Sequence, residues 1–300
     1  MMLSAVFQKP ITGYYEFRGV YVMSSYRIVA DSSSNVTDFA GAPFASVPLT
    51  ILAGGKHYVD DAHLDVASMV RDLSHLHERS STACPGPHDW ESAFGDAENV
   101  FCIAITSTLS GSCNAARLAA RDYEETHPGR RVHVIDTLST GPEMRLVIEK
   151  LAELFAKEMP FDAIVEEITR YLRRTHLYFI LQSVHNLVQN GRVGVAIGAL
   201  VGLLGIRIVG KASDRGDLQT TAKCRGDRKA LKEVVSSLHA EGWKGGKVRI
   251  DHCDNEPFAA ALRDALLADF PAADITLHPA RGLCSYYAEA GGIMLAFEDN

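Results

Sequence analysis

Residues 99–120, NVFCIAITSTLSGSCNAARLAA, contain the transition that decides the fold. The first seven are apolar almost throughout, as expected for a strand whose two faces are both covered by helices in a parallel sheet. Four hydroxyl residues and a glycine follow, and an alanine-rich helical segment comes next. The stretch therefore predicts a strand, a polar turn and a helix of an α/β domain.

The same alternation continues on both sides of this stretch. Residues 26–35 and 131–137 are apolar strand patterns that lead into polar turns, and residues 46–61 predict a strand, a Gly54-Gly55 turn and an acidic exit. Residues 63–78 and 143–158 have helical spacing of their apolar positions. We therefore expect an α/β domain over residues 24–175, with a mainly parallel, Rossmann-like sheet.

A second α/β domain is expected over residues 176–300, as a smaller α/β sandwich with a ligand between the domains. Its strand patterns begin at residue 177 and end at residue 298, with helical patterns between them. Residues 1–23 mix polar, charged and aromatic side chains. We expect them to form a disordered N-terminal extension.

Composition and charge narrow the possible partners. The 300 residues carry a formal charge of −7, which argues against a nucleic-acid partner because phosphate binding requires a basic surface. Residues 191–232 nevertheless contain nine Lys or Arg against three Asp. This segment is either a solvated face or a docking patch for an acidic or phosphate-bearing partner.

Cysteine spacing and the length of apolar runs bear on metal binding and localisation. The six cysteines form no C-x-x-C and match no zinc pattern, so we expect no metal and a reducing cytoplasm. The longest apolar run covers residues 193–206, shorter than the about 20 residues of a membrane span. We therefore expect no stable membrane insertion.

The hydroxyl-rich turn allows three interpretations. Its side chains could cap the helix, supply a nucleophile (Ser107 or Ser110) or bind an anion. Gly111 relieves crowding where the chain enters the helix, and free N–H groups at a helix N-terminus favour a negative group. Neither a G-x-S-x-G nor an H-E-x-x-H motif is present, and both the P-loop and G-x-G-x-x-G are missing as well.

Three glycines in the long apolar run repeat at helical spacing. Gly194, Gly198 and Gly202 would lie on one face of a helix, either to allow close helix packing or to line a narrow apolar tunnel. An anion site and an apolar tunnel together suggest a fatty acid. A chain of ~16 carbons would gain roughly 12 kcal/mol at most from burial, provided that the carboxylate is hydrogen-bonded.

In this order, the motifs resemble those of the DegV family of fatty-acid-binding proteins, which includes the bacterial FakB proteins. The resemblance runs from about Tyr26 to the C-terminus. It rests on Asp31-Ser32-Ser33, Val47-Pro48-Leu49, Gly54-Gly55-Lys56 before Asp60, Thr82 with Pro85, Ser107-Thr108-Leu109-Ser110-Gly111, Asp136-Thr137, Gly191-Arg192 and the segment 223–230.

The resemblance implies a two-domain protein that holds one long-chain fatty acid, needs no cofactor and has no catalytic activity of its own. Thr82 and Ser110 would bind the carboxylate, with Ser107, Gly111 and Tyr287 as further candidate contacts. FakB-type members are carriers that present the acid to a separate fatty acid kinase, which forms an acyl-phosphate for phospholipid synthesis. The residues expected to dock such a kinase are Arg192, Lys223, Arg225 and Arg228.

The sequence departs from the family pattern in two places near the expected site. Residues 82–85 are Thr-Ala-Cys-Pro where the family has Thr-Ser-Gln-Pro, and Tyr287 stands where the family has a histidine. A tyrosine can donate a hydrogen bond but cannot become cationic. Two alternatives therefore stay open: a serine-dependent hydrolase or transferase, and a lipid sensor without a kinase partner.

Overall fold

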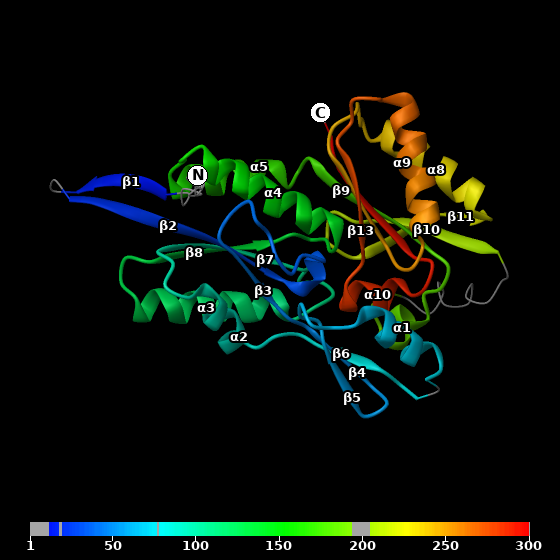
Figure 1. Ribbon diagram of the computed structural model, residues 1–300, viewed down its shortest axis with the longest axis horizontal. Helices are drawn as coiled ribbons and strands as arrows, with labels where there is room; N and C mark the ends of the chain where they lie inside the picture. Colours follow the sequence, from blue (N-terminus) through cyan, green and yellow to red (C-terminus); the bar gives the residue numbers. More distant parts are fainter. Residues whose placement is uncertain (1–11, 18–19, 77, 194–204, 300) are drawn as a thin grey trace, which may run out of the picture.

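The computed structural model describes residues 12–17, 20–76, 78–193 and 205–299. Two large sheets, one in each half of the chain, lie at an angle to each other, and a small third sheet lies beside them (Figure 1). The predicted α/β class with a mainly parallel N-terminal sheet is confirmed. The predicted boundary near residue 175 stays a prediction; strand β9 begins at Thr175.

Strand β7 is central to the first sheet, and all six of its residues are buried. It pairs in parallel with β2 on one side and β8 on the other, while the end of β2 also pairs in parallel with β3. The sheet comprises β1 (Thr12–Phe17), β2 (Val20–Asp31), β3 (Phe44–Val47), β7 (Asn99–Ala104) and β8 (Arg131–Asp136).

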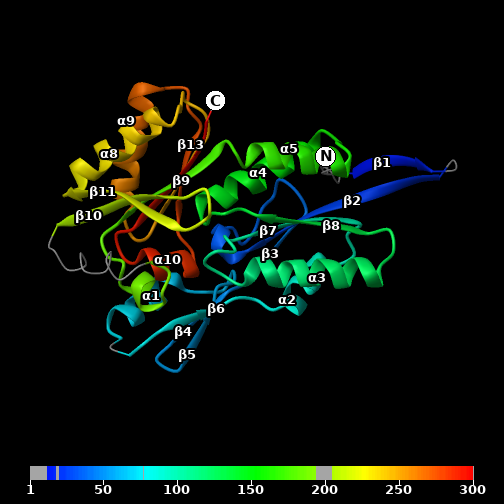
Figure 2. The same ribbon diagram turned by 180° about the vertical axis from the view of Figure 1, so that it is seen from behind.

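Helices cover both faces of this sheet, which explains why β7 is apolar throughout. Val100 and Cys102 pack with the helices on one face, and Phe101 and Ile103 pack with those on the other. Figure 2 shows the two helix layers from behind. The first layer is α2 (Pro87–Phe94) and α3 (Ser112–Thr126), and the second is α4 (Pro142–Ala156) and α5 (Phe161–Tyr171).

The N-terminal extension expected over residues 1–23 is described only in part, because residues 1–11, 18 and 19 lie outside the described residues. Thr12–Phe17 pairs antiparallel with the beginning of β2 in a hairpin that projects from the sheet (Figure 1). The segment is rich in aromatic and β-branched residues, which favour strands. Helical and strand patterns in the sequence do not predict this short hairpin.

The second sheet has the order β11-β10-β9-β14-β12-β13 and is antiparallel except for the β12–β13 pair. Helices α8 (Asp227–Ala240) and α9 (Glu256–Asp269) cover its outer face. Its strands are β9 (Thr175–Leu181), β10 (Ile206–Ala212), β11 (Leu218–Arg225), β12 (Val248–His252), β13 (Ile275–Pro279) and β14 (Ile293–Glu298).

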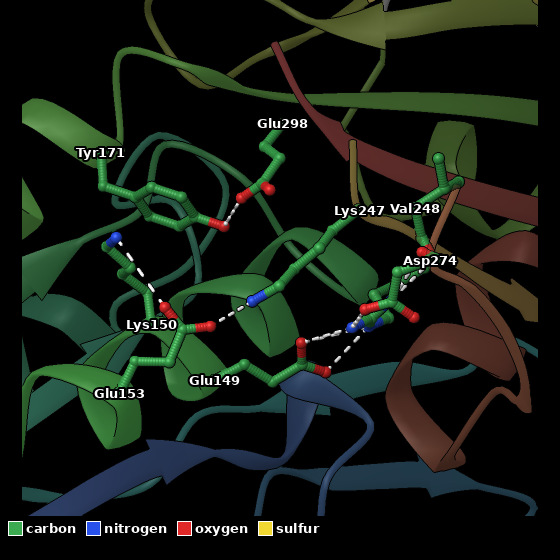
Figure 3. Close-up of polar contacts among 9 residues, drawn as sticks. Glu149, Lys150, Glu153, Tyr171, Lys247, Val248, Asp274 and Glu298 are labelled. Carbon is green, nitrogen blue, oxygen red and sulfur yellow. Dashed lines mark hydrogen bonds and ion pairs between the residues drawn. The ribbon is translucent and has the colours of Figure 1, made fainter. Parts of the chain in front are cut away.

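Helix α4 packs against both large sheets and joins them in one core. Charged side chains reinforce this joint (Figure 3). Glu149 of α4 accepts hydrogen bonds from Arg249 of β12 at 2.7 and 2.8 Å, and Asp274 accepts another at 2.8 Å. Glu153 of α4 pairs with Lys247.

In Figure 1 the third sheet lies below this joint between the two large sheets. It contributes one wall of the site that the next subsection describes. Strand β4 pairs antiparallel with β5 and with β6, and α1 packs nearby with α10. Helix α10 lies between the halves of the molecule (Figure 1). These elements are β4 (Thr50–Ala53), β5 (Lys56–Val59), β6 (Ser81–Ala83), α1 (Val66–Ser74) and α10 (Gly282–Ala288), with α6 (His185–Gln189) beside α10.

Two expectations concern the apolar run over residues 193–206: a tunnel lined by its glycines and the absence of a membrane span. The structure describes this run only in part. Gly194, Gly198 and Gly202 lie outside the described residues. Among the residues that the structure describes, no helix is long and apolar enough to cross a membrane.

Candidate functional site

A cavity lies between the end of the first sheet and the inner face of the second. Ile105, directly after β7, and Leu177, Phe179 and Leu181 of β9 belong to its apolar wall. Five residues with hydroxyl or charged side chains also line it, one of them Thr140. We call the other four the polar site: Thr82, Ser110, Arg192 and Tyr287. The sequence places these residues far apart, and the packing of β6, α3 and α10 brings them together.

Thr82 and Tyr287 form one side of the polar site. Thr82 Oγ1 and the Tyr287 hydroxyl oxygen lie 2.8 Å apart, and only one hydrogen is needed for the bond between them. The second hydroxyl hydrogen is available to another acceptor. Burial raises the pKa of Tyr287, so the phenol is neutral at physiological pH. The pair can therefore donate a hydrogen bond to a negative group.

Ser110 and Gly111 form a second side, at the beginning of α3. Ser110 Oγ accepts a hydrogen bond from Ser112 N at 3.3 Å, which leaves its own hydrogen free to donate elsewhere. Gly111 is the N-cap of α3. The first N–H groups of a helix have no intrahelical acceptor and carry a partial positive charge. This side of the site also favours an anion.

Arg192 lies in the cavity wall, which differs from its expected place on a docking surface. The guanidinium donates from Nε to Leu109 O at 3.0 Å and from Nη1 to Asn190 O at 2.6 Å. These bonds use two of its five hydrogens, and the side chain is half-buried. The Gly191-Arg192 motif indicated an important residue, but its position became clear only from the fold. Arg192 supplies a positive charge near Tyr287 and lines the same cavity as Ser110.

The other predicted site residues lie farther out. Ser107 is exposed, and its backbone N–H donates to Asp136 Oδ1 at 3.1 Å. Ser107 is not among the described residues that line the cavity. Lys223 and Arg225 are exposed on β11, and Arg228 is exposed in the first turn of α8.

The cavity continues into a mainly apolar space. A smaller cavity shares Phe179, Leu181, Leu187 and Leu218 with the larger one and is also lined by Val193, the last described residue before the glycine-rich segment. The polar site thus lies in the wall of a mainly apolar cavity. This combination suits an amphipathic ligand with one small anionic group.

Several residues that line the cavity were not predicted from the sequence. Cys84, Thr140 and Cys284 also border the cavity. Cys84 and Gly111 approach closely, since a Cβ at Gly111 would lie 3.2 Å from Cys84 Sγ. Cys84 directly follows β6, and its position two residues after Thr82 could have indicated that both side chains lie on the same side of the chain. In the described part of the chain, no group of three or more His, Cys, Asp or Glu could hold a metal ion.

Comparison with known proteins identifies the family. A family model described as "Uncharacterised protein, DegV family" matches residues 25–298. The chain belongs to the DegV family. A DegV domain-containing protein of Streptococcus pneumoniae strain R6 is 42% identical over 278 residues, which cover 91% of this chain and 99% of that protein.

Two solved structures of DegV relatives have closely similar folds. The DegV family protein of Eubacterium eligens, loaded with heptadecanoic acid, matches with a TM-score of 0.90 and 40% identity over 92% of this chain and all of that one. The Fatty Acid Kinase B3 protein of Streptococcus pneumoniae, loaded with linoleic acid, matches with a TM-score of 0.90 and 42% identity over the same shares.

Proposed function

We propose that this DegV-family chain binds one long-chain fatty acid, with the carboxylate at the polar site and the acyl chain along the apolar wall. The observation that carries the proposal is the Thr82–Tyr287 hydroxyl pair in an otherwise largely apolar cavity. The relatives loaded with heptadecanoic and linoleic acids support the ligand class.

The energetics of such a ligand match the distribution of polar groups. Each buried methylene contributes about 0.8 kcal/mol, so the tail provides most of the affinity. A buried carboxylate without partners would cancel much of this gain. Thr82, Ser110 and Tyr287 offer hydroxyl donors, while Arg192 provides the positive charge that Tyr287, in the place of a histidine, cannot.

We further propose that the protein is a carrier without catalytic activity. A serine nucleophile requires a base within hydrogen-bond distance, and no histidine lines the cavity in the described part of the chain. All six cysteines are free thiols, in accord with a carrier that works in the reducing cytoplasm.

Lys223, Arg225 and Arg228 are the residues that we propose for docking a fatty acid kinase. All three are exposed and basic, and a kinase with bound nucleotide presents phosphate groups to such a surface. Triple charge reversal to glutamate should reduce acyl-phosphate formation by a supplied bacterial fatty acid kinase subunit. Fatty acid binding should remain unchanged. If the wild-type protein binds lipid but supports no phosphorylation by the kinase, it is instead a lipid sensor.

Native mass spectrometry tests the ligand directly. The purified protein should carry a mass excess that matches a fatty acid, leaves on denaturation and reappears in the lipid extract. A bare protein that also ignores added palmitic, heptadecanoic and linoleic acids would overturn the proposed function.

A further inference from the structure

Two fully buried carboxylates lie behind the polar site without belonging to the described cavity wall. Asp31 ends β2 and Asp60 follows β5, and both have no exposed surface. Burial raises the pKa of both groups. Keeping a carboxylate in such a place is costly unless hydrogen bonds compensate, so the groups bonded to each are informative.

Asp31 fixes both ends of the segment that carries Ser110. Its Oδ2 atom accepts hydrogen bonds from Ile105 N at 2.9 Å and from Ser112 Oγ at 2.8 Å. Ile105 begins the turn after β7, and Ser112 begins α3. One oxygen atom thereby holds the start and the end of the turn whose last residues form the cavity wall.

Asp60 fixes the start of the helix that carries Tyr287. Its Oδ1 accepts from Gly282 N at 2.8 Å and its Oδ2 accepts from Leu283 N at 2.9 Å, the first two residues of α10. The approach requires glycine at position 282, because a Cβ there would lie 2.7 Å from Asp60 Oδ1. Asp60 itself directly follows β5, a strand of the small sheet that also contains Thr82. It therefore links the two elements that bear the Thr82–Tyr287 pair.

Ser32 connects the two carboxylates. It follows Asp31 in the chain, its hydroxyl interacts with the Asp60 carboxylate, and its Oγ accepts from Leu49 N at 3.0 Å. Asp60 N donates in turn to Leu49 O at 2.9 Å. Leu49 lines the cavity. The hydrogen bonds of Ser32, which follows Asp31, and of Asp60 thus meet at Leu49, a residue of the cavity wall.

We propose that Asp31 and Asp60 are positioning residues of the polar site: Asp31 holds Ser110 in place, and Asp60 holds Tyr287 against Thr82. The inference rests on the proposed function and adds how its hydroxyl donors are set before the ligand arrives. Hydrogen-bond donors that are already in position bind a carboxylate without the loss of affinity that ordering them during binding would cause.

The test compares a fatty acid with the alcohol of the same chain length, because both share the tail and differ in the charge of the head. In Asp60→Asn, the amide can accept only one of the two N–H bonds, and its NH₂ group opposes the other. Affinity for palmitic acid should fall roughly tenfold, as for a lost hydrogen bond to a charged group. Affinity for hexadecanol should change less than about twofold, because the apolar wall is intact.

Double-mutant cycles show whether each carboxylate acts through its proposed partner. Asp60→Asn should cost little more once Tyr287→Phe is present, and Asp31→Asn should cost little more once Ser110→Ala is present. Asp72→Asn is the matched control, since Asp72 is an exposed carboxylate of α1 that bonds Lys56 and Tyr58. It should leave both affinities unchanged.

Equal losses for acid and alcohol, or additive cycles, would overturn the inference while leaving the proposed function intact. A wild-type protein that binds neither lipid would overturn both. If the aspartate variants fail to fold, Ser112→Ala removes one bond to Asp31 and keeps the carboxylate. It should weaken palmitic acid binding severalfold, but not hexadecanol binding, and it should have no effect in a Ser110→Ala background.

Discussion

Thr82 and Tyr287 stand 205 positions apart in the chain, yet their hydroxyl oxygens lie 2.8 Å from each other. One belongs to a short strand of the small sheet and the other to the last turn of α10. Both side chains are only partly exposed, and both line the cavity. The contact joins the two halves of the chain at the cavity wall, and one of the two hydroxyl hydrogens stays available to a ligand.

Removing either hydroxyl should weaken fatty acid binding. Thr82→Val and Tyr287→Phe keep the shape of each side chain, so we expect each to cost about 1–2 kcal/mol, or roughly 5- to 30-fold in Kd. Because the two hydroxyls share one bond, the double variant should cost less than the sum. Isothermal titration with palmitic acid measures this, and strictly additive losses would show that the hydroxyls act separately.

Ser110→Ala distinguishes the carrier from a serine enzyme. For a carrier, the variant should only weaken lipid retention, by about 1–3 kcal/mol for a lost bond to a charged group. A hydrolase or transferase would lose its turnover. Release of product from p-nitrophenyl and thioester substrates by the wild type gives the answer, and Ser107→Ala tests the other candidate nucleophile. Turnover that disappears in either variant would contradict the carrier assignment.

Cys84 should report on ligand occupancy through its reactivity. It is the one exposed cysteine among the six, and it lines the cavity next to Gly111. Burial raises the pKa of the other five thiols and makes them unreactive. Iodoacetamide should therefore modify Cys84 first, and bound fatty acid should slow the reaction at least severalfold. Equal rates with and without lipid would place the ligand elsewhere.

Local patterns predicted the parts of the fold whose packing is regular. The continuous apolar stretch of β7 and the amphipathic pattern of α4 were recognisable because helices cover both sheet faces. The sequence pattern predicts one strand and a turn over residues 46–61, whereas the end of β3 and the β4–β5 hairpin belong to different sheets. Pro48, which lacks an N–H, stands at the change of sheet.

The polar site was predicted in part. Thr82, Ser110 and Tyr287 came from family motifs, and the structure brings them to one cavity. The sequence predicts a docking role for Arg192, because a motif identifies a residue without giving the direction of its side chain. Helix α10 was not predicted, since its seven residues are too few to show helical periodicity. Its position depends on Asp60, a contact across 222 positions.

The Arg249–Glu149 pair should make a large contribution to stability. Arg249 is nearly inaccessible, with 6% of its side chain exposed, and bonds Glu149 of α4 and Asp274 (Figure 3). Arg249→Met leaves these carboxylates without their cation, so we expect the free energy of unfolding to fall by about 3 kcal/mol. Urea denaturation measures the change. Arg170→Gln, which breaks an exposed pair with Glu167, should change it by less than about 1 kcal/mol.

Asp251 should make the stability of the protein depend on pH. It is fully buried at the joint between the halves, where Asn35 Nδ2 donates to its Oδ2 at 2.6 Å. Burial raises its pKa to about 7, although Arg145 and Asn35 act in the opposite direction. A carboxyl group whose pKa is higher in the folded state than in the unfolded state stabilises the fold while it is protonated. That contribution is lost as the pH rises from about 4 to about 7.

Asp251→Asn keeps the shape of the side chain and cannot titrate, so the comparison isolates this one group. The free energy of unfolding of the wild type, relative to Asp251→Asn, should fall by up to about 1.4 kcal/mol per pH unit in this window. Urea denaturation at pH 5, 6, 7, 8 and 9 measures the difference. The two curves should run parallel above pH 8, where the folded-state carboxyl is ionised. Parallel curves from pH 5 upward would mean that the carboxyl titrates at an ordinary pKa and that Arg145 compensates its burial.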